Sequence, residues 1–212
     1  MDKIFFIMLF IGVYIYAESV LGISALSSTL KQQMIKGDSY KEECPVALKD
    51  LRHLHLKYLS FEGKTLVGEM IVHKDVAVEV VNIFNELYRI NYPIHAMELI
   101  SEYKGSDWKS IEADNTSAFN CRHATGSKKW SKHSYGKAID INPIENPYIS
   151  KNGHISHKAS EKYRKRIHQK NIYPENWALL LKNDQATQIF KKYGWTWGGD
   201  WSSVKDYQHF SK

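Results

Sequence analysis

Residues 131–140 read Ser-Lys-His-Ser-Tyr-Gly-Lys-Ala-Ile-Asp and place a histidine seven positions before an aspartate. Gly136 lies between them and permits a tight turn, which would bring His133 back beside Asp140. The alternation that follows puts isoleucine side chains on one face of a short strand and the carboxylate of Asp140 on the other. A carboxylate within an apolar strand is costly unless it is paired or bound to a metal. This stretch therefore predicts a turn followed by a strand, with Asp140 paired or metal-bound.

Two further segments carry groups of the same kind of chemistry. Asp206 and His209 are three positions apart, and they would face one point on a helical turn or a bulged strand end, but not on a regular strand. Two imidazoles and one carboxylate are the ligands of many catalytic zinc sites. Because such His/Asp pairs are also common in surface loops, spacing alone leaves that alternative open. The hypothesis assigns one zinc ion to His133, Asp140 and His209, the general base to Asp206 and oxyanion stabilisation to Arg122.

The ten residues match every fixed position of the SxHxxGxAxD signature, and the chain resembles the zinc D-Ala-D-Ala peptidases and L-alanyl-D-glutamate endopeptidases. The similarity covers about residues 43–210 and includes NTSAFNCR (115–122), DINP (140–143), WGGDW (197–201) and DYQHF (206–210). It implies the Hedgehog/DD-peptidase fold and hydrolysis of bacterial peptidoglycan peptides. It also implies that His133, Asp140 and His209 bind the zinc ion, that Arg122 stabilises the transition state and that Asp206 is the base.

One position bears on which bond is cut. The dipeptidases have Glu three residues before the last ligand, whereas this chain has Asp206, as the endopeptidases do. The shorter side chain requires the backbone to approach the metal more closely. We therefore expect cleavage of the L-Ala–D-Glu bond, with the D-Ala-D-Ala carboxypeptidase reaction as the alternative. A non-catalytic wall-binding domain with structural zinc is a further alternative, but it would need a fourth protein ligand.

The N-terminus has the pattern of an export signal. Lys3 precedes an apolar run of 14 residues from Ile4 to Ala17, about 21 Å as a helix against about 30 Å of bilayer hydrocarbon. We expect residues 1–17 to be a signal peptide. An uncleaved anchor is the alternative, because Ile15 is a poor match three positions before the cleavage point. The predicted location is the periplasm, the cell wall or the extracellular space, with membrane contact only for the uncleaved form.

Behind the signal segment, residues 18–45 show no clear periodicity and are predicted to be an arm. Residues 46–212 are predicted to form one zinc peptidase domain. Helical and strand patterns are mixed there without a βαβ rhythm, which indicates the α+β class with a small antiparallel sheet flanked by helices. We expect the chain to be a monomer.

Individual patterns predict the elements of that domain. Alternating apolar residues predict a hairpin around the Phe61–Lys64 turn. Apolar residues at three- and four-residue spacing predict a helix from an N-cap at Asp75 through Tyr88. A short strand is predicted over residues 97–100 and a second helix over residues 177–193.

The net charge of +6 on 212 residues is a local feature. Residues 150–175 carry seven Lys or Arg against two Glu, an excess of +5. This segment is predicted to be a solvated loop or a surface that attracts an anionic wall polymer. The chain has no recognisable nucleic-acid-binding motif and export argues against such a role, so nucleic acid is not expected as a partner.

Several residues keep two interpretations. Ser131 either contacts substrate or shapes its turn, and Trp195 and Trp197 either line a substrate groove or fill the core, whereas core or wall packing is favoured for Trp201. The two cysteines either form a disulfide in an oxidising compartment or leave Cys121 as a buried thiol. The remaining histidines are predicted to be surface or packing residues.

Overall fold

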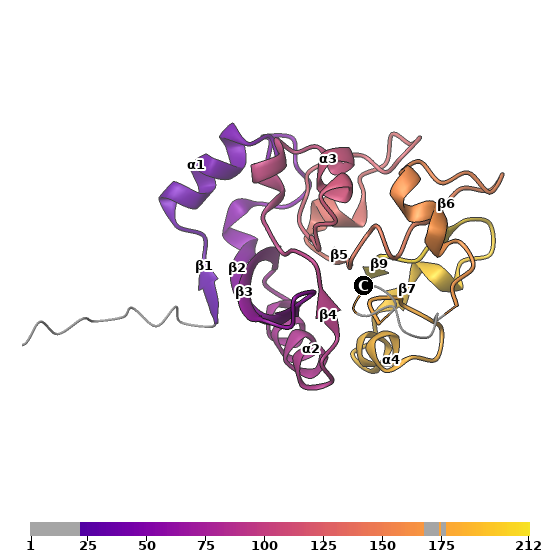
Figure 1. The fold of residues 1–212 in the computed structure, drawn as a ribbon. Helices are drawn as coiled ribbons and strands as arrows, with labels where there is room; N and C mark the ends of the chain where they lie inside the picture. The colour runs from indigo at the N-terminus through magenta and orange to yellow at the C-terminus, as the bar shows by residue number, and fades with distance from the viewer. Residues whose placement is uncertain (1–21, 168–173, 175–176) are drawn as a thin grey trace, which may run out of the picture.

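The computed structural model describes residues 22–167, 174 and 177–212. The predicted signal peptide and part of the basic segment lie outside these residues. The strands are β1 Ile23–Ala25, β2 Leu51–Ser60, β3 Thr65–His73, β4 Pro93–Ile94, β5 Ala138–Asp140, β6 Tyr148–Ile149, β7 Thr196–Trp197, β8 Lys205–Asp206 and β9 His209–Ser211. The α-helices are α1 Ser28–Lys36, α2 Ala77–Arg89, α3 Asp107–Glu112 and α4 Gln185–Lys192. The fold is α+β, as predicted (Figure 1). In the part of the chain described, no helix has the length and apolar character needed to cross a bilayer.

The predicted hairpin is confirmed and forms the larger sheet. Strands β2 and β3 pair antiparallel from Leu51 opposite His73 to Leu59 opposite Thr65. Strands β1 and β4 pair with opposite ends of β2. Gly63 in the connecting turn has a φ of 72°, a conformation that glycine adopts without strain.

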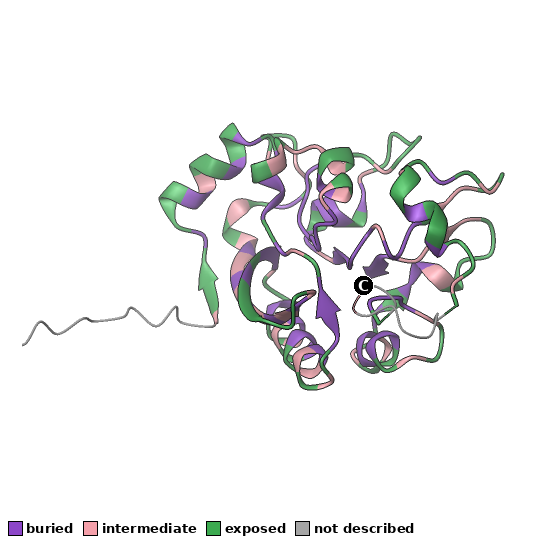
Figure 2. Cartoon of the chain, in the orientation of Figure 1, coloured by how far each residue is buried: buried purple, intermediate pink, exposed green. Residues whose placement is uncertain are grey.

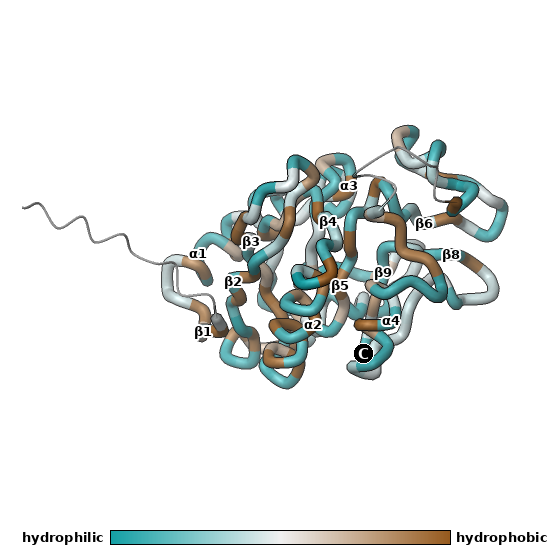
Figure 3. Tube along the Cα trace, turned by 60° about the horizontal axis from the view of Figure 1, so that its bottom comes forward, coloured by the Kyte–Doolittle hydropathy of each residue, from teal (hydrophilic) through white to brown (hydrophobic). Residues whose placement is uncertain are grey.

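Helix α2 packs on this sheet with its predicted apolar stripe. Val80, Ile83 and Phe84 are buried in one core with residues of β2 and β3, and brown apolar segments run along α2 and β5 in Figure 3. The prediction of Asp75 as N-cap is wrong. Val76 occupies that position, and the carboxylate of Asp75 instead forms ion pairs across the turn with His73 and Lys137.

A second sheet, in the order β5-β9-β7, completes the core. The rings of Phe210 in β9 and Phe190 in α4 stack with centroids 3.9 Å apart. Burying rings of this size contributes about 1.5–3 kcal/mol each. Strands β5 and β9 are purple, and therefore buried, in Figure 2. The same core includes residues of α2 and of the hairpin, so the two sheets share one hydrophobic interior.

Two predicted elements, a helix over residues 177–193 and a strand over residues 97–100, differ in the structure. In both segments an asparagine side chain hydrogen-bonds backbone groups that a regular helix or strand would use. Helix α4 begins only at Gln185, since Asn146 hydrogen-bonds the carbonyl of Ala178 and the amide of Leu180 ahead of it. Residues 97–100 form no strand, because the amide of Asn115 binds both backbone groups of Glu98 in place of a neighbouring strand. Asparagine side chains can replace backbone partners in this way.

The described part of the predicted arm packs against the domain. Strand β1 pairs with β2, and Leu30 and Met34 of α1 are buried in a second hydrophobic cluster with residues of the hairpin. Cys44 and Cys121 form a disulfide, with Cα atoms 5.8 Å apart, and they are 77 positions apart in the chain. The interpretation of Cys121 as a free thiol is therefore wrong.

We expect Cys44→Ser to destabilise the protein by about 4 kcal/mol, because the disulfide closes a long loop and restricts the unfolded chain. For a chain of this length, that is a decrease in Tm on the order of 10 °C, measured by thermal unfolding. As the control, a reductant should lower the Tm of the wild type and leave that of Cys44→Ser unchanged. An unchanged Tm in the variant would contradict the expectation.

A buried pair of carboxyl groups makes stability depend on pH. Burial, together with the negative charge of neighbouring Asp114, raises the pKa of Glu145 from 4.5 to about 9. The folded protein therefore keeps a proton on Glu145 that the unfolded chain releases, so this contribution to stability is full below pH 4.5 and is lost as the pH rises to about 9.

In Glu145→Gln the side-chain amide can still donate a hydrogen bond to Asp114, but the side chain no longer has an ionisable proton. We expect its Tm to decrease less than that of the wild type between pH 6 and pH 9, because glutamine has no proton to lose. Thermal unfolding over this pH series measures the difference. Parallel curves for the two proteins would show that the folded state does not raise the pKa of Glu145.

Candidate active site

The turn before β5 has the predicted form. Residues Lys132–Tyr135 make one turn of 3₁₀ helix, and the hydroxyl oxygen of Ser131 accepts a hydrogen bond from the amide of His133 at 3.3 Å. Gly136 ends the turn with a φ of 65°, and a Cβ there would lie 2.6 Å from the backbone nitrogen of His73. Only glycine meets both requirements without strain, so the chain reverses here and continues into β5.

The three predicted ligands converge in the interior. Antiparallel pairing of β5 with β9 places Asp140 directly opposite His209. The Nε2 atom of His133 lies 3.2 Å from Oδ2 of Asp140 and 3.2 Å from Nδ1 of His209. Nδ1 of His209 lies 3.0 Å from Oδ1 of Asp140. All three side chains are buried, and their donor atoms lie within 4.8 Å of one another.

The surroundings of these residues fit a divalent metal. Nδ1 of His133 contacts the carbonyl oxygen of Ala118 at 2.5 Å and must carry the proton there, which leaves Nε2 as a lone-pair donor. Burial would raise the pKa of Asp140, but the charges and hydrogen bonds of His133 and His209 outweigh it and lower that pKa. Two imidazoles that lose the proton of the ligating nitrogen when a cation binds, together with an ionised carboxylate, are a donor set that zinc accepts, with a fourth position left for water.

Asp206 lies at the same cleft as His209 because a turn separates the two residues. Their spacing in the sequence alone did not predict this turn. It ends β8, residues 207 and 208 form a turn, and His209 begins β9, so both side chains line the same cleft. The lack of a side chain on Gly198 lets the chain approach closely, because a Cβ there would lie 2.4 Å from the carbonyl oxygen of Asp206. Oδ1 of Asp206 is buried with no hydrogen-bond partner. Burial raises the pKa of Asp206 to about 7, against the lowering effect of His209.

Arg122 is held at the cleft by contacts from two segments. Its backbone amide donates to the hydroxyl of Ser134 at 2.9 Å, and its guanidinium forms an ion pair with Asp107 at 3.0 Å. Asp107 begins helix α3, which Ser106 caps. Sequence reasoning did not identify Asp107 as a residue of the site. No local pattern reveals it, because its partner is 15 positions away in the chain.

These groups border a cleft of about 800 Å³. The lining also includes Trp108 and His157, whose rings stack with centroids 3.9 Å apart. Ser131, which caps the turn before β5, also lines the cleft. The cleft is therefore large enough for several residues of a peptide, with the His133–Asp140–His209 cluster on its wall.

The tryptophans sort differently from the prediction. Trp195 and Trp197 are 2% and 3% exposed and belong to the hydrophobic core, so they do not contact substrate. Their indole nitrogens donate inside the protein, to Glu79 and to the carbonyl of Tyr207. Trp201, for which packing was favoured, is 37% exposed and lines the cleft, with its ring centroid 5.4 Å from that of His209.

The basic segment is not uniformly solvated. The guanidinium of Arg166 hydrogen-bonds Asn146 and the carbonyl of Leu180 and lies 4.4 Å from the centroid of the Tyr207 ring. Burial lowers the pKa of Arg166 to about 10. This residue therefore supports the chain behind the cleft instead of presenting its charge to a polymer.

Residues 125–212 match the family model described as D-alanyl-D-alanine carboxypeptidase. The match covers less than half of the 212-residue chain. No curated protein and no solved structure matches the chain. The matched segment contains the three candidate ligands and Asp206, whereas Arg122, Asp107 and the carbonyl of Ala118 precede it. The candidate site is thus assembled from the matched segment and from residues outside it.

Proposed function

We propose that this peptidase is zinc-dependent and hydrolyses peptide bonds in peptidoglycan stem peptides. The observation that carries the proposal is the buried cluster of His133, Asp140 and His209 beside a cleft that also holds Asp206 and Arg122. Among the described residues, three protein donors converge at this point. A structural zinc site would use four, so the arrangement favours catalysis over a non-catalytic wall-binding role.

Each side chain has a part in hydrolysis. A zinc ion at the three ligands would supply Lewis-acid chemistry, polarising the scissile carbonyl and making a water molecule more acidic. Asp206 takes the proton of the attacking water and passes it to the leaving amine, because its pKa of about 7 makes both protonation states accessible near neutral pH. Arg122, positioned by Asp107, stabilises the negative charge that develops on the carbonyl oxygen.

The bond between L-Ala and D-Glu is the proposed site of cleavage, with D-Ala-D-Ala cleavage as the alternative. Support comes from Asp206, because the endopeptidases have Asp at this position where the dipeptidases have Glu. Peptidoglycan is anionic, and a second cavity of about 740 Å³ is lined by five lysines. Three residues, Lys129, Trp130 and Lys132, border both cavities. We therefore assign attraction of an anionic wall polymer to this cavity as well as to residues 150–175.

Export is proposed on two grounds. The N-terminal pattern is that of a signal peptide. The disulfide between Cys44 and Cys121 is typical of proteins that fold in an oxidising compartment. Both are consistent with action in the periplasm, the cell wall or the extracellular space.

Digestion of defined muropeptides tests the proposed function. The full chain is incubated with tripeptide- and pentapeptide-containing muropeptides, with and without a zinc chelator, and products are identified by mass spectrometry. We expect cleavage between L-Ala and D-Glu that stops with chelator and returns with added zinc. Release of terminal D-Ala would select the carboxypeptidase alternative, and no product from zinc-loaded protein would refute the proposal.

A further inference from the structure

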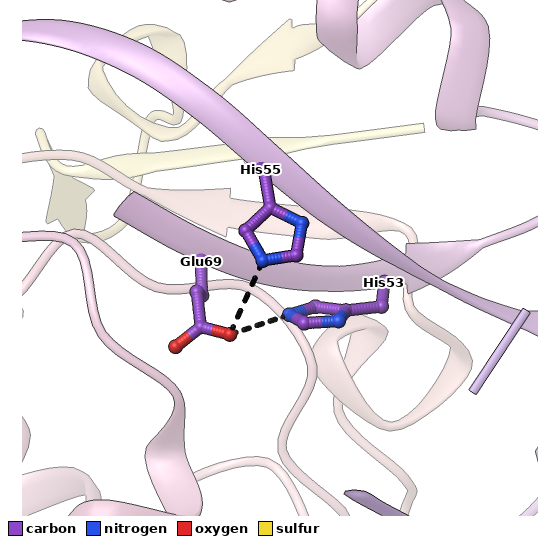
Figure 4. Close-up of side chains that lie close together, drawn as sticks. All are labelled: His53, His55 and Glu69. Carbon is purple, nitrogen blue, oxygen red and sulfur yellow. Dashed lines mark ion pairs between the residues drawn. The ribbon is translucent and has the colours of Figure 1, made fainter. Parts of the chain in front are cut away.

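A second group of potential metal donors lies on the larger sheet. His53 and His55 are two positions apart on β2, so their side chains emerge on the same face. Glu69 of β3 is the direct cross-strand partner of His55. Figure 4 shows the three side chains converging from different directions. Oε1 of Glu69 lies 2.8 Å from Nε2 of His53 and 3.6 Å from Nε2 of His55.

The contacts within this group leave one potential metal donor, Nε2 of His53, without a hydrogen bond. Nε2 of His53 is buried, yet its geometry makes no hydrogen bond although Glu69 is 2.8 Å away. The imidazole rings of His53 and His55 lie with centroids 4.4 Å apart, tilted by 53°, and both turn Nε2 toward the same carboxylate oxygen. One ion pair does not account for two imidazoles aimed at one oxygen. A cation bound by all three would use the buried nitrogen as a ligand.

The exposure of the group suits a bound ion with water. The side chains of His53, His55 and Glu69 are 13%, 33% and 48% exposed, so one side is closed by protein and the other is open to solvent. All three donor atoms lie within 4.8 Å of one another. Two nitrogen donors and one oxygen donor suit zinc and its neighbours, whereas calcium and magnesium require oxygen ligands.

We propose that His53, His55 and Glu69 form a second site for a zinc-class divalent cation, separate from the catalytic cleft. The site joins β2 to β3, and His53 is also the cross-strand neighbour of Ser24 in β1. An ion bound there would crosslink β2 and β3 at the position where β1 pairs with β2. Its role is structural, because none of the three ligands lines the cleft. The proposal does not rest on the peptidase activity.

Zinc counting in the full chain tests the second site. The wild type is compared with four variants: His55→Ala, Glu69→Gln, His133→Ala and the double variant His55→Ala/His133→Ala. Each protein is dialysed against micromolar free Zn²⁺, and bound zinc is measured by inductively coupled plasma mass spectrometry. We expect two zinc ions per wild-type chain, one for each single variant and none for the double variant. His154→Ala, which replaces an exposed histidine elsewhere, is the matched control and should keep two.

A second measurement separates this site from the catalytic one. In the His133→Ala background, added Zn²⁺ should raise the Tm, because an ion that binds only the folded chain stabilises it. This increase should disappear in the double variant, while His55→Ala alone should keep wild-type peptidase activity. One zinc ion per wild-type chain, with none in His133→Ala, would overturn the second site and leave the proposed function intact. Unchanged zinc content in His133→Ala, with loss in His55→Ala, would instead count against the catalytic site.

Discussion

Replacing Asp206 by alanine is expected to lower kcat/KM on a muropeptide by about 10²–10⁴-fold, the usual contribution of general acid–base catalysis. The zinc content should stay at the wild-type value. Zinc should remain bound because the three converging donors come from other residues. Asp206 lines the cleft with an unpartnered carboxylate oxygen, which is available to accept a proton. Burial raises its pKa to about 7, and a cation at the neighbouring ligands would favour its ionised, basic form.

Steady-state assays and zinc analysis of the same preparations check this expectation. Asp206→Asn should behave like Asp206→Ala, because the amide preserves the shape but cannot accept the proton. The exposed Glu112 of α3 offers a matched control, and Glu112→Ala should retain wild-type turnover. Full activity of Asp206→Ala would exclude it as the base. Loss of one zinc ion would place it among the ligands instead.

His133→Ala is expected to lose the catalytic zinc and, with it, activity by a factor on the order of 10³ or more. A metal that polarises a carbonyl contributes several kcal/mol to the transition state, and each 1.4 kcal/mol corresponds to a factor of ten. Removal of this imidazole also leaves the buried Asp140 with one of its two histidine neighbours and deprives the carbonyl of Ala118 of its partner.

The measurement is peptidase activity together with zinc per chain, which should decrease by one. Because His133 is buried, far-ultraviolet circular dichroism should accompany both to show that the variant folds. His133→Gln keeps a polar side chain of similar length and should lose zinc as well. A folded His133→Ala protein with full zinc content and activity would show that the ligand assignment is wrong.

Local interactions in the site were predictable from sequence. The turn that joins Ser131 to Asp140 spans ten residues and depends on a glycine with positive φ, so its geometry is encoded where it forms. The hairpin around Phe61–Lys64 and the apolar stripe of α2 are local in the same sense. Hydrophobic periodicity and turn preferences depend on residues within a few positions of each other. The sequence window therefore contains all the groups that determine these elements.

Other features depended on contacts between distant segments. The 177–193 pattern was expected to be wholly helical, but Asn146, about 30 positions earlier, binds backbone groups at its start. Tryptophan side chains occur both in substrate grooves and in hydrophobic cores. Trp195 and Trp197 are in the core, because their neighbours from α2, α4 and β9 enclose them. Competing side chains of this kind are invisible to a window of neighbouring residues, which is why the boundaries and the burial were mispredicted.

The sequence by itself determined the signature, the identity of the candidate ligands and base, and the local turn that brings His133 to Asp140. The tertiary structure alone decided which groups complete the site. Pairing of β5 with β9 sets His209 against Asp140, the start of α3 sets Asp107 against Arg122, and the disulfide ties the segment containing Arg122 to the N-terminal part of the domain. Those partners are 15 to 77 positions apart, and only the packing of strands and helices around one core brings them into contact.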